Sequence, residues 1–164
     1  MLTSAGFKVR RDDIKTGMLK ELTVRPIVGE GFQGGPFFKV YRENSTRIRI
    51  PRFYGQHHYP QFVHDASIEA CATIDVPFAG KLKEENQQHV ASATVCNVLR
   101  TKGGGILSLP TGYGKTTVAL HVLSVMSVKT LIIVHKEFLM NQWIDRIRQF
   151  LPNARIGVIR QNKV

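Results

Sequence analysis

One stretch of the sequence constrains the fold more than any other: residues 106–120 read ILSLPTGYGKTTVAL. The apolar residues Ile106–Leu109 predict a short buried strand, a glycine-punctuated loop follows, and a helix is predicted from Lys115 to about Met126. Glycine permits backbone conformations with positive φ and lets the chain approach a ligand closely. A strand, a glycine-rich loop and a helix in this order are typical of a loop that binds phosphate.

The chemistry of such a loop assigns roles to its residues. Backbone N–H groups and the positive end of the following helix attract an anion. The Lys115 ammonium is expected between the β- and γ-phosphates of a nucleotide, and the Thr116 hydroxyl is expected to bind Mg²⁺. Lys115 and Thr116 are therefore the predicted catalytic residues, and Thr116 is the only predicted metal ligand. The predicted nucleotide-binding residues are Pro110, Thr111, Gly112, Tyr113, Gly114, Lys115, Thr116 and Thr117.

Helix and strand patterns alternate around this loop. A helix is predicted over residues 86–101, a second apolar strand over Thr130–Val134, a helix over Lys136–Phe150 and a third strand over Arg155–Arg160. Trp143 has helical spacing with apolar neighbours and is expected in the core rather than on a base-stacking surface. Alternation of this kind predicts an α/β fold with a parallel sheet.

The first half of the chain has a different pattern. Gly and Pro predict a loop over residues 25–36, and FFKVYREN (37–44) and Arg47–Ile50 predict two strands of a hairpin that turns at Glu43–Ser45. We therefore expect two domains, with a boundary near residue 80. Residues 1–79 would form a small β-rich accessory domain, and residues 80–164 would form the α/β segment.

The net positive charge of the chain indicates what kind of partner it could bind. The net charge is +11, and residues 81–164 contribute +8 of it, from twelve Lys and Arg against four acids. Such an excess favours polyanions, although a basic surface without a specific ligand explains it equally well. No apolar run has membrane-spanning length, so no membrane partner is expected. The two cysteines, Cys71 and Cys96, form no disulfide framework, which favours a reduced, intracellular compartment.

Several motifs resemble those of one family. LPTGYGKT departs from the general phosphate-loop pattern by having Leu109 in place of glycine, and it is similar to the A-P-T-G-x-G-K-T form of superfamily two helicases. VHKEFLMNQW (134–143) resembles motif Ia of the branch that contains the XPB and UvsW-type helicases. Residues 78–164 as a whole are most similar to helicases of large DNA viruses. The resemblance implies part of a RecA-like lobe that uses ATP and Mg²⁺.

The resemblance also implies site residues outside the loop. GKLKEENQQHV is similar to the branch's adenine-reading entry, with one extra residue, so either Asn86 or Gln87 could read adenine. Gln87 is preferred, and an exposed glutamine at a helix start is the alternative. His135 and Lys136 follow a predicted strand and would contact the nucleic-acid backbone. Capping of the sheet edge would explain His135 equally well.

Hydrolysis of ATP in this family needs a strand that ends in D-E-x-x. After Lys115 the only acids are Glu137 and Asp145, both within the motif Ia helix. The second RecA-like lobe with its arginine finger is also missing. We therefore expect the first part of a longer helicase, or a truncated product, that stops before D-E-x-x. Such a chain would bind nucleotide weakly and hydrolyse it negligibly.

The N-terminal segment offers two further candidate sites. In FFKVYRENSTRIRIPRFYG, aromatic residues are interleaved with basic ones, and Arg47, Arg49 and Arg52 could bind nucleic acid. A hairpin with rings toward the core and arginines toward water is slightly favoured. A second candidate is a zinc site, but the spacing fits no standard pattern, so none is expected. Its residues would be His57, His58, His64 and Cys71.

Three classes of function remain. The leading one is an ATP-dependent helicase or translocase with nucleic acid as partner, DNA being favoured over RNA. If the chain is viral, it would act in the host cytoplasm, a virus factory or the virion. A second class is another phosphate-loop enzyme such as a nucleotide kinase, although VHKEFLMNQW does not resemble an arginine-rich lid. The third is a non-catalytic nucleic-acid or partner-binding protein with a relic loop.

Overall fold

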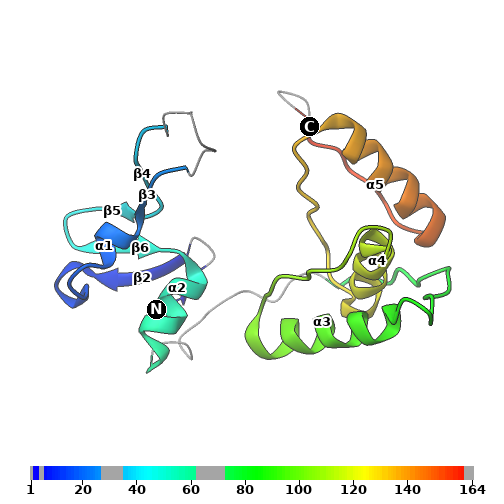
Figure 1. Cartoon of the computed structure of the whole chain (residues 1–164), viewed down its shortest axis with the longest axis horizontal. Coiled ribbons are helices and arrows are strands. Elements are labelled where there is room, and N and C mark those ends of the chain that lie inside the picture. Colours follow the sequence, from blue (N-terminus) through cyan, green and yellow to red (C-terminus); the bar gives the residue numbers. More distant parts are fainter. Residues whose placement is uncertain (1, 4–5, 27–34, 62–72, 161–164) are drawn as a thin grey trace. The chain divides into compact units, whose positions relative to one another are not determined.

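The computed structural model describes residues 2–3, 6–26, 35–61 and 73–160. The chain divides into two units, residues 1–70 and 71–164 (Figure 1). Residues before the predicted boundary near 80 are already held to the second unit: Ile74 N donates to Ser127 O, and Ala79 N donates to Phe150 O. Within the described ranges, no helix combines the length and apolarity that crossing a membrane requires.

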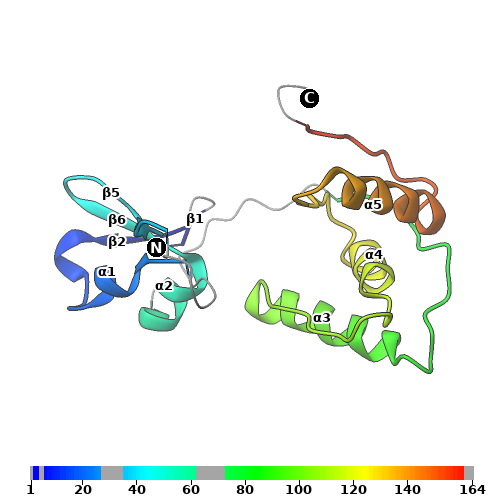
Figure 2. The ribbon, with the colours of Figure 1, turned by 45° about the horizontal axis from the view of Figure 1, so that its top comes forward.

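The first unit contains antiparallel sheets and short helices (Figure 2). Its main sheet has the order β1-β2-β6-β5, and a second sheet pairs β3 with β4. The strands are β1 Leu2–Thr3, β2 Gly6–Arg10, β3 Thr23–Val24, β4 Phe38–Lys39, β5 Arg42–Glu43 and β6 Arg47–Ile50. The helical elements are η1 Arg11–Asp13, α1 Met18–Glu21 and α2 Arg52–His58.

Alternation along the strands builds the core of this unit. In β6, Ile48 and Ile50 are buried and the arginines between them are exposed, because successive side chains point to opposite faces. Ile48 and Ile50 pair with Val9 and Phe7 of β2, and Phe7 is fully buried. Helix α2 covers this apolar face at close range, since a Cβ on Gly55 would lie 2.3 Å from the Phe7 ring.

The predicted hairpin forms, with its turn at residues 44–46. Asn44 Oδ1 accepts hydrogen bonds from Thr46 N and Arg47 N, which closes the turn. The single strand predicted over 37–44 is wrong, because it is divided between β4 in one sheet and β5 in the other. Val40 N still bonds Leu22 O, beside the β3–β4 pairing, and the chain bends there before it reaches β6.

The second unit contains the three helices that the sequence predicts. They are α3 Gln88–Lys102, α4 Lys115–Met126 and α5 Glu137–Phe150. The core between α3 and α4 is built around buried Cys96, Val118 and Val122. Partly buried apolar residues complete it: Ala91, Val95, Leu99, Leu107 and Met126.

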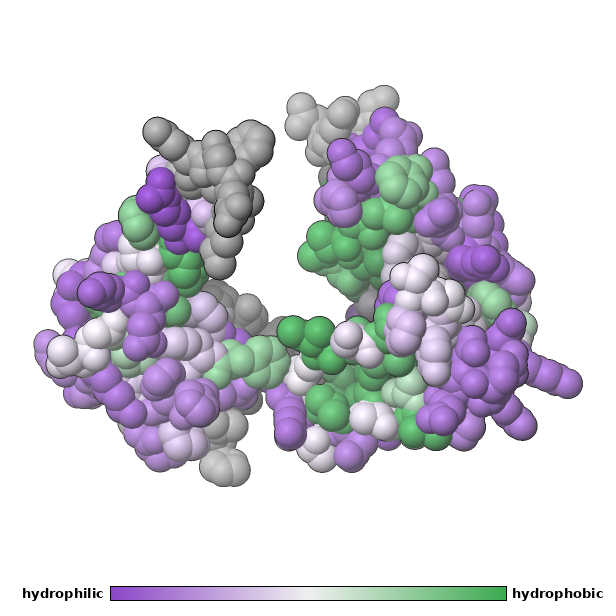
Figure 3. All heavy atoms as spheres, viewed as in Figure 1, coloured by the Kyte–Doolittle hydropathy of each residue, from purple (hydrophilic) through white to green (hydrophobic). Residues whose placement is uncertain are grey.

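The three predicted parallel strands do not form within the described residues. Segments 106–109, 130–134 and 155–159 have irregular backbone, and Ile106, Leu131 and Ile133 are 98%, 73% and 85% exposed. Exposed apolar side chains are visible on this unit in Figure 3. A parallel strand needs hydrogen bonds from neighbouring strands, and no strand among residues 73–160 runs beside these segments. The predicted parallel sheet is therefore not seen among the described residues, which form helices and small antiparallel sheets.

An aromatic cluster joins the three helices of the second unit. Phe78 stacks on Phe150 with ring centroids 5.3 Å apart and meets His121 edge-on at 5.1 Å. Ser92 Oγ lies 2.8 Å from His121 Nδ1. Gly80 leaves room for the two phenylalanine rings, since its Cβ would lie 2.7 Å from Phe150. Burial in this cluster lowers the pKa of His121 below its ordinary value of 6.5.

The lowered pKa of His121 predicts acid sensitivity of the second unit. The unfolded chain binds the proton more readily than the folded one, so the free energy of unfolding falls as pH drops below 6.5. His121→Gln keeps a hydrogen-bonding partner for Ser92 but cannot be protonated. Its unfolding free energy, measured by urea denaturation at pH 7, 6 and 5, is expected to decline less steeply than that of the wild type. Equal declines would contradict a role for His121.

Candidate nucleotide-binding site

The glycine-rich loop is folded into a turn at the start of α4. Tyr113 N lies 3.4 Å from Pro110 O, and Gly112 and Gly114 adopt φ values of 85° and 83°. These left-handed conformations favour glycine, which explains both positions. Gly114 is the N-cap of α4 and no side chain caps the helix. The N–H groups of the first turn therefore lack a side-chain acceptor and can serve an anion.

Lys115 places its ammonium against this loop. Its Nζ donates to Leu109 O and to Pro110 O, both at 2.9 Å, and the residue is exposed. Thr116 and Thr117 are half-buried in the first turn, whereas Thr111 is exposed. A Cβ on Gly112 would meet no atom within 4 Å, so the space beside that residue is open. The loop thus holds a cation, free amides and an open space together.

Gln88 contacts the same loop, and sequence reasoning missed it. Its Nε2 donates to Tyr113 O at 2.7 Å and its Oε1 accepts from Lys83 N at 2.9 Å, and the residue is 3% exposed. A Cβ on Gly114 would lie 2.4 Å from that Nε2. Helical spacing offered a signal, because Gln88 lies four and eight residues before buried Ser92 and Cys96.

The two sequence candidates for reading adenine lie beside Gln88. Gln87 is exposed and is the N-cap of α3, with a left-handed φ of 47°. Its N–H donates to Glu84 O at 2.8 Å. Asn86 is half-buried. Adenine recognition by either residue remains a prediction, and the side-chain amide that contacts the glycine-rich loop belongs to Gln88.

His135 and Lys136 are both exposed, in a bend immediately before α5. Lys136 is the extended N-cap of that helix. The next residue, Glu137, accepts two hydrogen bonds from the Arg160 guanidinium, at 2.5 and 2.8 Å. Trp143 is half-buried, as are its helix neighbours Leu139, Ile147 and Phe150. The predicted nucleic-acid contacts are thus accessible, and their role remains a prediction.

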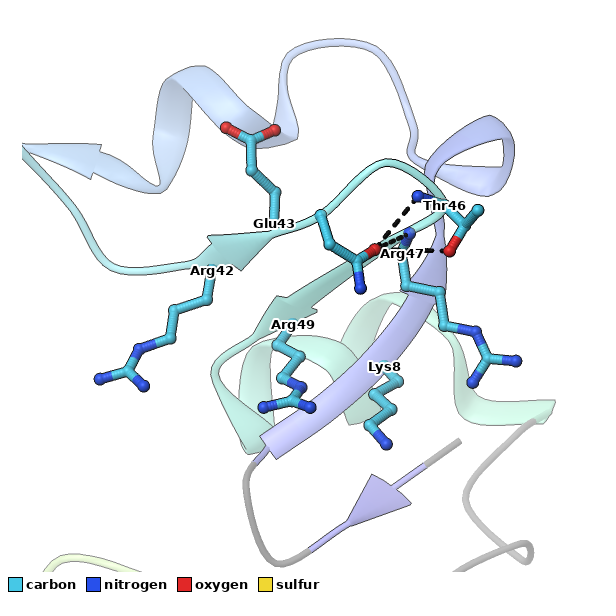
Figure 4. Close-up of a pocket in the computed structure, with 7 residues that line it drawn as sticks. Lys8, Arg42, Glu43, Thr46, Arg47 and Arg49 are labelled. Carbon is cyan, nitrogen blue, oxygen red and sulfur yellow. Dashed lines mark hydrogen bonds between the residues drawn. The ribbon is translucent and has the colours of Figure 1, made fainter.

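The N-terminal arginine candidates do not lie together. Arg47 and Arg49 line a pocket of about 500 Å³ with Lys8 and Arg42 (Figure 4). Arg52 is not among the residues that line it. Its guanidinium lies 5.5 Å from the centre of the Phe53 ring, and its buried Nε has no hydrogen-bond partner.

Metal-binding side chains do not gather in the described part of the chain. No group of three or more His, Cys, Asp or Glu residues there could hold an ion. His57 and His58 belong to α2, while His64 and Cys71 lie outside the described residues.

Comparison with known proteins decides the family. The family described as Type III restriction enzyme, res subunit, matches residues 81–164, just over half of the chain and the whole of the loop and its helices. The chain belongs to this res-subunit family. The predicted similarity to superfamily two helicases is thereby confirmed.

Named relatives of this res-subunit chain include viral and archaeal proteins. It is 30% identical to the putative ATP-dependent RNA helicase L396 of Acanthamoeba polyphaga mimivirus, over 99% of the chain and 33% of that protein. It is 32% identical to the putative helicase 109L of Invertebrate iridescent virus 3, over 93% of the chain and 49% of that protein. A 47-residue stretch is 53% identical to the DNA 3'-5' translocase XPB2 of Sulfurisphaera tokodaii, and it covers 29% of the chain and 11% of that protein. The chain thus spans a third to a half of the two viral relatives.

Proposed function

We propose that this chain binds the phosphates of ATP through Pro110–Thr117 and contributes to the motor of an ATP-dependent nucleic-acid helicase or translocase. One observation carries the proposal: the Lys115 ammonium is exposed and held by two carbonyls at the mouth of a loop with free helix N–H groups. An ammonium and several amides that converge on open space suit the anionic tail of a nucleotide.

Binding would exchange one set of contacts for another. The bonds from Lys115 to Leu109 O and Pro110 O would give way to charge-assisted bonds to the β- and γ-phosphates. Gly112 and Gly114 would let the backbone amides approach the phosphate oxygens. The bonds from Gln88 hold the far side of the loop in place meanwhile.

Thr116 fits the role of a magnesium ligand. Its hydroxyl is half-buried in the first turn of α4, directly after Lys115. Mg²⁺ in phosphate sites keeps several waters and takes few protein ligands, so one hydroxyl beside nucleotide oxygens is sufficient. The bound ion would neutralise part of the phosphate charge.

The predicted RecA-like sheet belongs to this proposal. Segments 106–109, 130–134 and 155–160 follow helices in the order that a parallel sheet requires, and each carries apolar residues. Their exposed isoleucine and leucine side chains support strands that pair in the whole protein. The first of these segments leads directly into the phosphate loop.

The nucleic-acid part of the proposal rests on His135 and Lys136. Both are exposed before α5, where a cation and a ring N–H could contact a phosphate backbone. The relatives' names mention both an RNA helicase and a DNA translocase, so either nucleic acid is a suitable first probe. Preference for DNA over RNA remains a prediction.

A series of nucleotides that differ only in phosphate number tests the proposal. Titration calorimetry with ATP, ADP and AMP in the presence of Mg²⁺ is expected to give AMP an affinity about 10- to 150-fold weaker than ATP. That range follows from ~1.5–3 kcal/mol for hydrogen bonds to charged groups. AMP binding as tightly as ATP, or no nucleotide binding at millimolar concentration, would contradict the proposal.

Hydrolysis forms a second arm of the same experiment. Both oxygens of Glu137 are bonded to Arg160, and Asp145 is on α5 with Arg148 3.9 Å away. Glu137 is thus occupied by Arg160, and neither acid lies at the end of a predicted strand, where a D-E-x-x carboxylate would lie. We expect phosphate release at the background rate, with or without nucleic acid. If nucleic acid binds while no nucleotide does, the non-catalytic alternative with a relic loop is supported instead.

A further inference from the structure

We propose that one face of the sheet in the first unit binds the phosphodiester backbone of a nucleic acid, independently of base sequence. The face belongs to strands β2, β6 and β5, and we call it the cationic face. It is defined by Lys8, Arg10, Arg42, Arg47 and Arg49. This site is separate from the phosphate loop, and only the choice of nucleic acid among polyanions rests on the proposed function.

Strand register brings these cations together. Lys8 of β2 pairs with Arg49 of β6, and Arg49 also pairs with Arg42 of β5. Arg10 pairs with Arg47 at the other end of the same two strands. Like charges directly opposite each other destabilise a sheet. A group of five cations on one face of the sheet is therefore unfavourable for the fold alone, and a bound polyanion would offset the repulsion.

Glu43 is an acid that lines the pocket of the cationic face, but its carboxylate is directed elsewhere. Glu43 accepts hydrogen bonds from Arg11 at 2.6 Å and from Lys39 at 3.0 Å. In Figure 4 its carboxylate points away from the side on which Arg42, Arg47 and Arg49 extend. Within the described residues, none of the arginines of the cationic face belongs to an ion pair. Their charge is thus available to a ligand.

The shape of the face suits an extended anion. Its pocket of about 500 Å³ is continued by a second one of about 310 Å³, and both are lined by Arg42 and Arg49. The opposite side of the sheet is anchored by buried Phe7, Val9 and Ile48. A rigid sheet thus presents guanidinium groups, which match phosphate oxygens in bidentate geometry.

Backbone contact is favoured over base stacking on this face. Tyr41, next to Arg42 in sequence, lines the second pocket, but it also packs against the hydrophobic core, with the Lys39 ammonium 5.3 Å from its ring centre. The residues of β2, β5 and β6 that share the face with the cations include no aromatic or aliphatic side chain. Insertion into a lipid bilayer would need such groups, whereas phosphate contacts need only charge.

A triple variant of the full chain tests the inference. Arg42→Gln/Arg47→Gln/Arg49→Gln removes three charges from the face. Lys20→Gln/Lys102→Gln/Lys129→Gln removes three exposed charges from elsewhere, so both variants have a net charge of +8 instead of +11. Affinity for a fluorescein-labelled 20-base-pair DNA would be measured by anisotropy, without nucleotide, as a function of salt concentration.

The slope of log affinity against log salt concentration is the salt slope. We expect its magnitude to fall by about 0.9 for each phosphate contact that the face variant loses, or by about 2.7 for three. At 0.1 M salt this amounts to a loss of affinity of up to about 500-fold. The control variant is expected to retain most of the slope. A second duplex of different sequence should give the same values. Equal losses in the two triple variants, or unchanged binding by the face variant, would overturn the inference.

Separate measurements test whether the face variant folds and whether the ligand is a nucleic acid. The thermal midpoint of the face variant should equal or exceed that of the wild type, because repulsion between paired strands is removed. If the triple variant fails to fold, Arg49→Gln alone should still lower the salt slope by about 0.9. Tighter binding to phosphatidylserine vesicles than to the duplex would overturn the assignment to nucleic acid. Loss of nucleotide binding in Lys115→Ala, with duplex binding unchanged, would separate this site from the phosphate loop.

Discussion

Replacing Lys115 with alanine is expected to weaken Mg-ATP binding by about 10- to 150-fold, the equivalent of ~1.5–3 kcal/mol for a hydrogen bond to a charged group. The ammonium is the positive charge that is hydrogen-bonded to the loop carbonyls Leu109 O and Pro110 O. When the ammonium is removed, only the backbone amides of the loop remain to bind the phosphates. The affinity would be measured by calorimetry with Mg-ATP.

The fold should survive this substitution. Lys115 is exposed and its side chain bonds only to carbonyls of its own loop, so the thermal midpoint should change little. Lys129→Ala is the matched control, since it removes an exposed lysine that follows the same helix. Lys115→Ala binding Mg-ATP as well as Lys129→Ala would show that the ammonium does not serve the nucleotide.

The substitution Gly114→Ala is expected to destabilise the second unit by about 2–5 kcal/mol and to impair nucleotide binding with it. A left-handed backbone costs a non-glycine residue about 1–2 kcal/mol, and Gly114 has φ 83°. The new Cβ would also lie 2.4 Å from Gln88 Nε2. That amide can move only by breaking its bonds to Tyr113 O and Lys83 N, at a cost of about 1–3 kcal/mol. Urea denaturation would measure the loss of stability.

A double-mutant cycle separates the two causes. Gln88→Ala removes the side chain that the new Cβ meets, so Gly114→Ala should cost less in that background. The remaining cost should be the backbone strain of about 1–2 kcal/mol. Gly112→Ala is the matched control, because Gly112 has a similar φ of 85° but no neighbour within 4 Å of its Cβ position. Additive effects of Gly114→Ala and Gln88→Ala would contradict the predicted contact.

The features predictable from sequence were those that depend on neighbouring residues. The helices α3, α4 and α5 follow from apolar residues at helical spacing, and each begins within two residues of its predicted start. The loop turn likewise follows from Gly112 and Gly114. The predicted parallel strands are not seen among the described residues, because a strand needs a partner elsewhere in the chain and periodicity carries no information about that partner.

The candidate sites also have local features, which the sequence predicts, and non-local features, which it does not. The alternation of Arg47 and Arg49 with Ile48 and Ile50 predicts which residues share a face. It does not reveal that Lys8, about forty residues earlier, pairs with Arg49, because register is a non-local property. Gln88 was missed for a similar reason: its partner Tyr113 is 25 residues away.

The bridge made by Gln88 has a consequence for affinity. One buried amide joins the backbone before α3 to the loop after it, through bonds to Lys83 N and Tyr113 O. A segment already fixed in this way loses less conformational entropy when it closes around a ligand. The glycines would otherwise make that loss large. Preorganisation of the loop thus lets more of the interaction energy with phosphate be realised as affinity.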